Sequence, residues 1–304
     1  MPRILVTEPI HDDAVALLRE AGCEITSDAP LDEVDAVIVR TDPIPAGALA
    51  PGRLKVISKH GVGVDNIPLE AARAAGIAVT NTPGANAGSV AEHALMLMLA
   101  LAKALPAMQR AARAGGLPDP AAQVIELAGR RLLVAGYGQS GKRLASLAAA
   151  LGMRVTVWSR SLKGATTPEG YTVAPDFRAA LPQSDVVSLH LPLVPETRGM
   201  LGAAELALLP RGALVINTGR GGLIDEAALL AADHLGGFGL DVVAGEPIRP
   251  DNPLLRAPNG IVTPHSAAMT GEAFRNMGMM AARNVLDALA GRADPTCLVV
   301  PPPG

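Results

Sequence analysis

The chain is poor in cysteine, in aromatic residues and in long apolar runs, and each scarcity excludes a class of protein. Of its 304 residues only Cys23 and Cys297 are cysteines, too few and too far apart for a disulfide framework or a thiolate metal site. The six histidines lack metal-ligand spacing as well, so no metal is predicted. The longest apolar run, residues 94–102, is far shorter than the roughly 20 residues that cross a bilayer.

The net charge of the chain is also small. The formal net charge is −3 and no basic run is present, so neither nucleic acid nor a membrane surface is an expected partner. Residues 1–7 lead directly into a strand pattern, without the basic region, apolar core and cleavage site of a signal peptide. A reducing cytoplasm is therefore the expected location.

What the chain does contain is a regular alternation of short apolar strands and helical stretches, which is typical of parallel α/β folds. Strands of a first sheet are expected at residues 4–7, 36–39, 54–58 and 77–80, with helices over 12–21 and 69–75. Six further strands are expected to begin at Arg131, Arg154, Val186, Leu214, Phe238 and Ile261, which is the number of a doubly wound nucleotide fold.

The connections between these elements suggest two domains. A long helix over 88–105 should link them, a surface loop should occupy 114–121, and a helix over 270–289 followed by a strand over 297–300 should return the chain. We therefore predict an α/β protein with two Rossmann-like, doubly wound domains, the first of them discontinuous. The first domain would comprise residues 1–94 and 276–304, and the second residues 95–275.

A glycine-rich turn is the strongest local signal. The apolar strand 131–135 runs into Gly136, Gly138 and Gly141 in the pattern GxGxxG, and a helix-forming stretch follows. The first glycine makes a tight turn, the second lets the backbone approach a pyrophosphate, and the third allows close packing of helix on strand. With Gln139 and Ser140 at the helix N-terminus, this turn predicts dinucleotide binding.

Polar residues follow three later strands in the same domain. Thr218 and Arg220 lie in a glycine-rich turn, Asp241 and Glu246 follow the next strand, and His265 follows the last. Ligands bind at the carboxyl ends of strands in such sheets, an arginine can fork onto a carboxylate, and a histidine can protonate a carbonyl oxygen. Taken singly, the arginine could equally lie in a surface turn and the histidine could be a packing or capping residue.

Several motifs together closely resemble the D-isomer-specific 2-hydroxyacid dehydrogenases, in that family's order and over nearly the whole chain. They occupy residues 59–67, 81–86, 89–92, 189–193, 217–225, 241–247 and 263–265. The resemblance implies that Arg220 binds the substrate carboxylate, that His265 is the acid/base and that Glu246 is its carboxylate partner. It also implies that the backbone of Val62 and Gly63 contacts the carboxylate and that Asp241 approaches the nicotinamide amide.

The resemblance further implies that residues 1–94 and 276–304 bind substrate and that residues 95–275 bind the dinucleotide. It also implies an enzyme that acts on a small-molecule substrate and forms a homodimer through its nucleotide domains. A corepressor-like, nucleotide-sensing binding protein of the same fold is the alternative. Formate dehydrogenases pair the histidine with glutamine, so Glu246 argues against that branch.

The cofactor and the substrate are predicted from single positions at which the chain departs from, or matches, the residues of this family. Ser159, Arg160 and Ser161 stand where an NAD-specific member places an acidic residue, so NADP is expected to be favoured over NAD, unless Arg160 merely stacks on the adenine. Arg40 and Lys59 match positions where phosphoglycerate enzymes place cations. Small polar 2-oxo acids such as glyoxylate, hydroxypyruvate or phosphohydroxypyruvate are the expected substrates.

Overall fold

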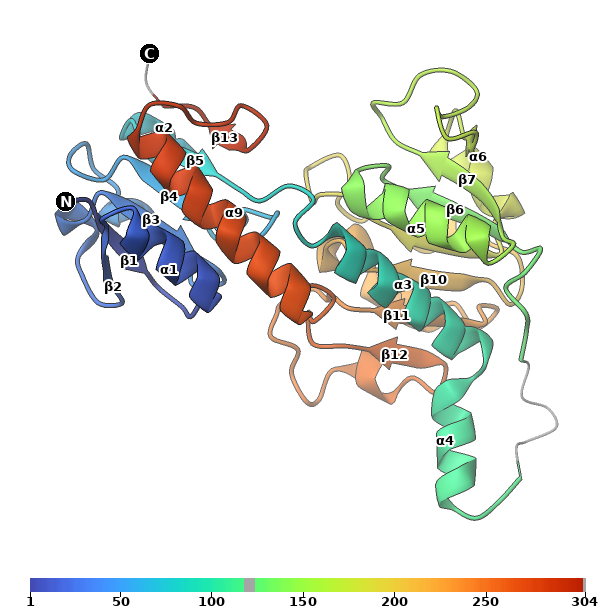
Figure 1. Ribbon diagram of the computed structural model, residues 1–304. Coiled ribbons are helices and arrows are strands. Elements are labelled where there is room, and N and C mark those ends of the chain that lie inside the picture. Colours follow the sequence, from blue (N-terminus) through green and yellow to red (C-terminus); the bar gives the residue numbers. More distant parts are fainter. Residues whose placement is uncertain (118–123, 303–304) are drawn as a thin grey trace. The chain divides into compact units, whose positions relative to one another are not determined.

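Two parallel sheets, each in its own part of the chain, make up the computed structural model, which describes residues 1–117 and 124–302 (Figure 1). Unit 1 consists of Met1–Asn86 and Ala268–Gly304, and unit 2 of Ala87–Ala267. The predicted boundaries at 94/95 and 275/276 lie eight residues further along, inside two helices. Those helices stay whole in the structure because each packs along its length on one core.

The sheet of unit 1 has the strand order β13-β5-β4-β3-β1-β2 in the described residues, and all its strands are parallel except β13. The strands are β1 (Arg3–Val6), β2 (Glu24–Thr26), β3 (Ala36–Val39), β4 (Val56–Lys59), β5 (Ala78–Thr80) and β13 (Leu298–Val300). Helices α1 (Asp12–Glu20) and α9 (Gly271–Leu289) cover one face and α2 (Leu69–Ala74) the other. The order reverses between β1 and β3, which is the point where such sheets bind ligands.

The sheet of unit 2 has the order β12-β11-β10-β9-β6-β7-β8, and its recorded strand pairs are all parallel. The strands are β6 (Arg131–Ala135), β7 (Arg154–Trp158), β8 (Thr172–Val173), β9 (Val186–Leu189), β10 (Leu214–Asn217), β11 (Gly237–Leu240) and β12 (Gly260–Val262). Here the order reverses between β6 and β9.

Helices cover both faces of the unit 2 sheet. Helices α3 (Ala87–Ala102) and α5 (Gln139–Ala150) pack on one face, where Leu97, Met98 and Leu144 are fully buried. Helices α6 (Phe177–Ala180), α7 (Ala203–Leu206) and α8 (Glu226–Ala231) lie on the other. Aliphatic side chains dominate both cores, as the scarcity of aromatic residues requires.

The expected linking helix differs from the observed one. It is broken at Ala104, whose φ is +46°, and α4 (Leu105–Arg113) begins anew with Pro106 in its first turn. Of the predicted loop 114–121, residues 118–121 lie outside the described residues. In the described part of the chain no single helix is long and apolar enough to cross a membrane, whereas α3 and α4 pass that test only as a pair bent by 59°.

Candidate active site

The glycine-rich turn in unit 2 has the geometry that its sequence predicts. Gly136 has a φ of +99°, and a Cβ atom there would lie 2.5 Å from the carbonyl oxygen of His190. A Cβ on Gly141 would lie 2.0 Å from the carbonyl oxygen of Gly136, so strand and helix approach too closely for a side chain. At Gly138, by contrast, no described atom lies within 4 Å of the Cβ position. The backbone is therefore open at the point where a pyrophosphate would approach.

This turn lies at the carboxyl end of β6, beside the loop that follows β9. Gln139 and Ser140 begin the 12-residue helix α5, whose N-terminal N–H groups favour an anion. His190 follows β9, and its Nδ1 lies 3.4 Å from the hydroxyl of Thr218. Burial lowers the pKa of His190 to about 4, so its ring is neutral near pH 7. His190 and Thr218 thus place polar, uncharged side chains directly after β9 and β10.

The end of β7 carries the residues predicted to select the cofactor. The hydroxyls of Ser159 and Ser161 lie 3.1 Å apart, and Arg160 is more than half exposed. The Arg160 guanidinium also lies 3.6 Å from the carboxylate of Glu196, which sequence reasoning did not assign to the site. The cation is accessible, but it already has an anionic neighbour.

The turn after β10 positions Arg220. The buried Asn217 side chain accepts a hydrogen bond from Gly219 N and donates one to the Arg220 carbonyl, which shapes the turn from within. The next residue is Gly221, where a Cβ would lie 2.0 Å from the carbonyl carbon of Val243. The turn after β10 therefore presses against the turn after β11, which leads to Glu246.

His265 and Glu246 form an ion pair after β12 and β11. His265 Nδ1 lies 2.6 Å from Glu246 Oε2, and the other carboxylate oxygen accepts from the N–H of Val243 at 3.1 Å. Both side chains are partly exposed, that of His265 by 52%. Because Nδ1 is engaged by the carboxylate, Nε2 is the atom that can exchange a proton with a ligand.

The charges of the pair shift the pKa values of both groups. The hydrogen bond that His265 donates to Glu246 raises the pKa of His265, against burial and the nearby Arg220 charge, which lower it. Burial raises the pKa of Glu246, but the His265 hydrogen bond and charge, with Arg220 as a smaller cause, hold it below the ordinary value. The structure thus brings Arg220, Glu246 and His265 together at one sheet edge, with an imidazole that keeps its proton to higher pH.

Asp241 is buried beneath this group, with 1% of its surface exposed. Its oxygens accept hydrogen bonds from Thr263 Oγ1 at 2.6 Å and from the backbone N–H groups of Ser266 and Ala267, both at 2.8 Å. Sequence reasoning expected Asp241 to approach the nicotinamide amide. Its observed contacts hold the segment that carries His265.

Unit 1 places Arg40 just after β3, at the reversal of strand order. Its guanidinium donates to the carbonyl of Pro9 and lies 5.1 Å from the centre of the Phe274 ring. The carboxylate of Glu8 accepts from the backbone N–H groups of Arg40 and Thr41 at 2.8 and 2.7 Å. Glu8 therefore anchors this loop, a role that no sequence pattern indicated.

Lys59 is tied to the same loop. Its ammonium donates to the carbonyl of Arg40 and to the side-chain oxygen of Asn66, and only 9% of the residue is exposed. Val62 and Gly63 lie in the turn that follows β4, where Asn81 donates to the Val62 carbonyl at 2.8 Å. Lys59 thus fastens the loop of Arg40, while Val62 is 43% exposed at the surface of unit 1.

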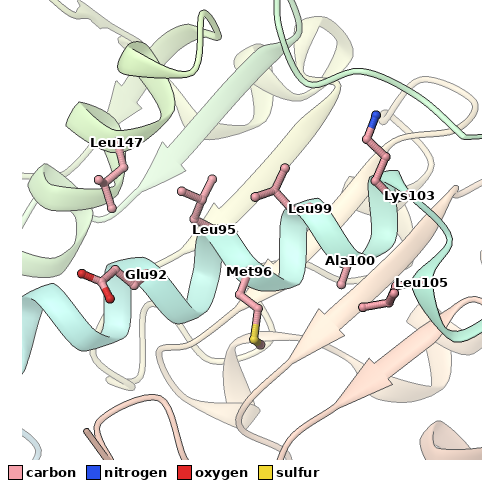
Figure 2. Close-up of a pocket in the computed structure, with 8 residues that line it drawn as sticks. All are labelled: Glu92, Leu95, Met96, Leu99, Ala100, Lys103, Leu105 and Leu147. Carbon is pink, nitrogen blue, oxygen red and sulfur yellow. The ribbon is translucent and has the colours of Figure 1, made fainter. Parts of the chain in front are cut away.

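A groove of about 460 Å³ lies elsewhere in unit 2, on the outer side of α3 (Figure 2). Its walls are Glu92, Leu95, Met96, Leu99, Ala100, Lys103, Leu105 and Leu147. None of the predicted site residues lines it, and most of its lining side chains are aliphatic. In the described residues no three His, Cys, Asp or Glu side chains converge in a way that would hold a metal ion.

Comparison with known proteins identifies the family of the chain. The family described as "D-isomer specific 2-hydroxyacid dehydrogenase, NAD binding domain" matches residues 95–267, more than half of the chain. A glyoxylate reductase of Aeropyrum pernix is 34% identical over 317 residues, which cover 97% of this chain and 95% of that protein. The crystal structure of the TT0316 protein from Thermus thermophilus has a TM-score of 0.87 and 36% identity, and the match covers 98% of this chain and all of that one.

Other relatives are longer than this chain. A D-3-phosphoglycerate dehydrogenase of Archaeoglobus fulgidus is 36% identical over 303 residues, which cover 95% of this chain but 58% of that protein. The chain thus spans less than two thirds of the length of the phosphoglycerate dehydrogenases it matches. The glycine turn, the Arg220, Glu246 and His265 group and these matches lead to one conclusion: the chain belongs to the family of D-isomer-specific 2-hydroxyacid dehydrogenases.

Proposed function

We propose that the protein transfers a hydride between a nicotinamide cofactor and a small polar 2-oxo or 2-hydroxy acid, with the D-isomer as the hydroxy form. The observation that carries the proposal is the 2.6 Å contact of His265 with Glu246 at the sheet edge that also presents Arg220. An acid with a raised pKa beside a carboxylate-binding cation suits the reduction of a carbonyl next to a carboxylate.

Each residue has a separate part in this reaction. Arg220 binds the substrate carboxylate through its forked guanidinium and orients the neighbouring carbonyl. His265 donates the proton on Nε2 to the carbonyl oxygen during reduction and removes it during oxidation. Glu246 holds the ring through Nδ1 and stabilises the imidazolium. The bound nicotinamide supplies or accepts the hydride.

The cofactor would lie along the turn formed by Gly136, Gly138 and Gly141, with NADP favoured over NAD. Arg160 supports this preference because a guanidinium pairs well with a 2′-phosphate. Glu196, 3.6 Å from Arg160, competes for the same cation, so the preference should be incomplete.

The cofactor preference is tested by kcat/KM with NADPH and NADH in the wild type and in Arg160→Ala. The variant should lose much of any NADPH advantage, because a charge-assisted contact contributes about 1.5 to 3 kcal/mol. Arg154→Ala, at the opposite end of β7, is the matched control. Equal losses with both cofactors in Arg160→Ala would indicate stacking on the adenine instead.

For the substrate we propose a polar acid of the glyoxylate, hydroxypyruvate or phosphohydroxypyruvate type. The backbone of Val62 and Gly63 would contact its carboxylate, and Arg40 would be the cation for its polar end. Lys59 would contribute through the loop that it fastens rather than as a free cation, since its ammonium already has two oxygen partners.

The decisive experiment is a panel of glyoxylate, hydroxypyruvate, pyruvate, phosphohydroxypyruvate and phenylpyruvate with both reduced cofactors. Turnover of one or more polar acids is the expected result. Tight cofactor binding without turnover of any of them would favour the nucleotide-sensing, corepressor-like alternative.

The two buried free thiols, Cys23 and Cys297, suit a cytoplasmic location, which localisation of a tagged chain would test.

We also propose that the protein is a homodimer joined through the groove on α3. Helix α4, which lies wholly within the described residues, buries none of its nine side chains, and so short a helix is marginal alone. Its Leu105 is 55% exposed and lines the same groove as Met96, which is 45% exposed. One face thus carries both a groove and a projecting amphipathic helix, the combination that two copies related by a twofold axis can exchange (Figures 1 and 2).

Light scattering after size exclusion tests the dimer. Leu105→Asp should yield monomers, whereas Leu255→Asp, a control in unit 2 whose leucine is 44% exposed outside the groove, should keep the wild-type mass. A monomeric wild type would contradict the proposal.

A further inference from the structure

Helix α3 carries a histidine that contacts the supports of the candidate catalytic residue. His93 Nε2 lies 2.9 Å from Thr263 Oγ1 and 3.4 Å from Asp241 Oδ1, and its side chain is only 15% exposed. Sequence reasoning gave His93 no role in the site. All three residues belong to unit 2, although they come from α3, the end of β11 and the segment after β12.

The protons in this contact can be assigned from the number of donors and acceptors. The Thr263 hydroxyl has one proton, and at 2.6 Å from a carboxylate that can only accept, it donates to Asp241. Its oxygen must then accept from His93, which places a proton on His93 Nε2. The result is a directed chain from the His93 N–H through the Thr263 hydroxyl to the Asp241 carboxylate.

The chain ends on the segment that holds His265. Besides Thr263, Asp241 accepts from Ser266 N and Ala267 N, and its own backbone carbonyl accepts from His265 N at 2.8 Å. His265 has a φ of +53°, a left-handed conformation that a residue with a Cβ keeps only when its surroundings impose it. The hydrogen bonds to Asp241 impose this conformation on His265.

The charge of Asp241 also affects the pKa of His265. The Glu246 hydrogen bond is the main cause that raises the pKa of His265, and the charge of the Asp241 carboxylate adds to it, while burial and the Arg220 charge oppose it. A shift of Asp241 would therefore change both the position of the imidazole and its affinity for a proton.

We propose that His93 is a positioning residue for the acid/base His265, acting through Thr263 and Asp241. The inference rests on the proposed function only in that His265 is taken as the acid/base. It adds a residue from α3, the helix whose Ser89 hydroxyl also donates to the Ala267 carbonyl. His93 is the outermost donor of the hydrogen-bond chain that ends at the buried Asp241 carboxylate.

The test compares two substitutions at His93 with the same two at His234. His93→Leu removes the donor, whereas His93→Gln keeps an N–H at similar reach. His234 is a matched control because it is a partly buried histidine of unit 2 whose ring contacts only a backbone carbonyl in its recorded hydrogen bond, that of Leu206 at 3.1 Å.

Two readouts are needed, and only one depends on turnover. His93→Leu should lower kcat/KM for 2-oxo acid reduction by about tenfold to a hundredfold and move the alkaline limit of the pH profile to lower pH, because small misplacements of reacting groups are costly. His93→Gln should recover most of both effects. An NMR titration of the His265 ring should show a lower midpoint in His93→Leu and a wild-type midpoint in His234→Leu.

The outcomes separate this inference from the proposed function. A wild type without turnover contradicts the proposed function, yet the NMR titration still decides the role of His93. If the His265 ring titrates alike in His93→Leu and in the wild type, the inference is wrong. The same holds if His93→Leu and His234→Leu only lower the melting temperature, with unchanged pH profiles.

Discussion

Alanine substitutions in the glycine turn should separate the need for close packing from the need for ligand approach. In Gly138→Ala the new methyl group meets no described atom within 4 Å, and the φ of −81° suits any residue. Removing a glycine from such a position stabilises a protein by about 0.4 to 1 kcal/mol through the unfolded state. Gly138 is also the N-cap of α5, where alanine is less favourable than glycine, and this cost offsets the gain, so we expect a melting temperature close to that of the wild type.

Gly136→Ala, in contrast, should be strongly destabilising. Its Cβ would lie 2.5 Å from the His190 carbonyl oxygen at a φ of +99°. Backbone strain of about 1 to 3 kcal/mol and overpacking of a similar size would together remove a large part of a typical stability of roughly 5 to 15 kcal/mol. This variant should therefore unfold at a clearly lower temperature.

Cofactor binding is the second measurement. Trp158 is the only tryptophan of the chain and ends β7, next to β6, so quenching of its fluorescence reports on a bound nicotinamide dinucleotide. The methyl group of Gly138→Ala would stand where the pyrophosphate approaches. Losing one charge-assisted contact, about 1.5 to 3 kcal/mol, corresponds to a Kd raised roughly 10-fold to 150-fold. Wild-type affinity in Gly138→Ala would refute the assignment of this turn.

Three further substitutions test the remaining groups. Glu246→Gln removes the charge that raises the pKa of His265; because reduction needs the protonated ring and fails as pH rises through that pKa, the alkaline limit should move to lower pH, and an unchanged profile would deny the pairing. Arg220→Lys cannot fork onto a carboxylate, so KM for the 2-oxo acid should rise about tenfold while the cofactor Kd stays constant; an unchanged KM would reject Arg220 as the carboxylate ligand. The Glu8 carboxyl is partly buried, which raises its pKa, but hydrogen bonds from the loop after β3 lower it to about 2 from an ordinary 4.5. Its stabilising effect is therefore present above pH 4.5 and lost towards pH 2, so urea unfolding of Glu8→Gln should differ from the wild type by about 1 to 3 kcal/mol at pH 7 and converge with it near pH 2. Curves that stay equally far apart at both pH values would contradict this.

Most of the fold could be predicted because its strands are buried on both faces and read as continuous apolar runs. The elements that were missed lack that signal. Strand β2 (Glu24–Thr26) is a three-residue edge strand without a buried residue, and β8 (Thr172–Val173) has only two residues. The break between α3 and α4 had a signal in Pro106, which cannot continue a helix but fits the first turn of a new one.

The candidate site was predictable wherever function requires a residue type directly after a strand. Gly136, Arg220 and His265 belong to that class. The sequence could not indicate what Lys59 or Asp241 contact, because their partners are fixed by folding. The contact of His93 with Thr263 joins residues 170 apart, and α3 by itself reads as an ordinary buried helix.

The interrupted course of unit 1 affects how the chain folds as it is synthesised. Helix α9 supplies Ala281, Ala282 and Val285 to a core whose other members include Ile4 and Ala14. The ribosome makes all of Ala87–Ala267 between these two groups. Unit 2 can therefore fold while the strands of unit 1 still expose an apolar face and the open edge of β5, which β13 later covers. We therefore expect the nascent chain to be most exposed to aggregation in the interval before α9 emerges.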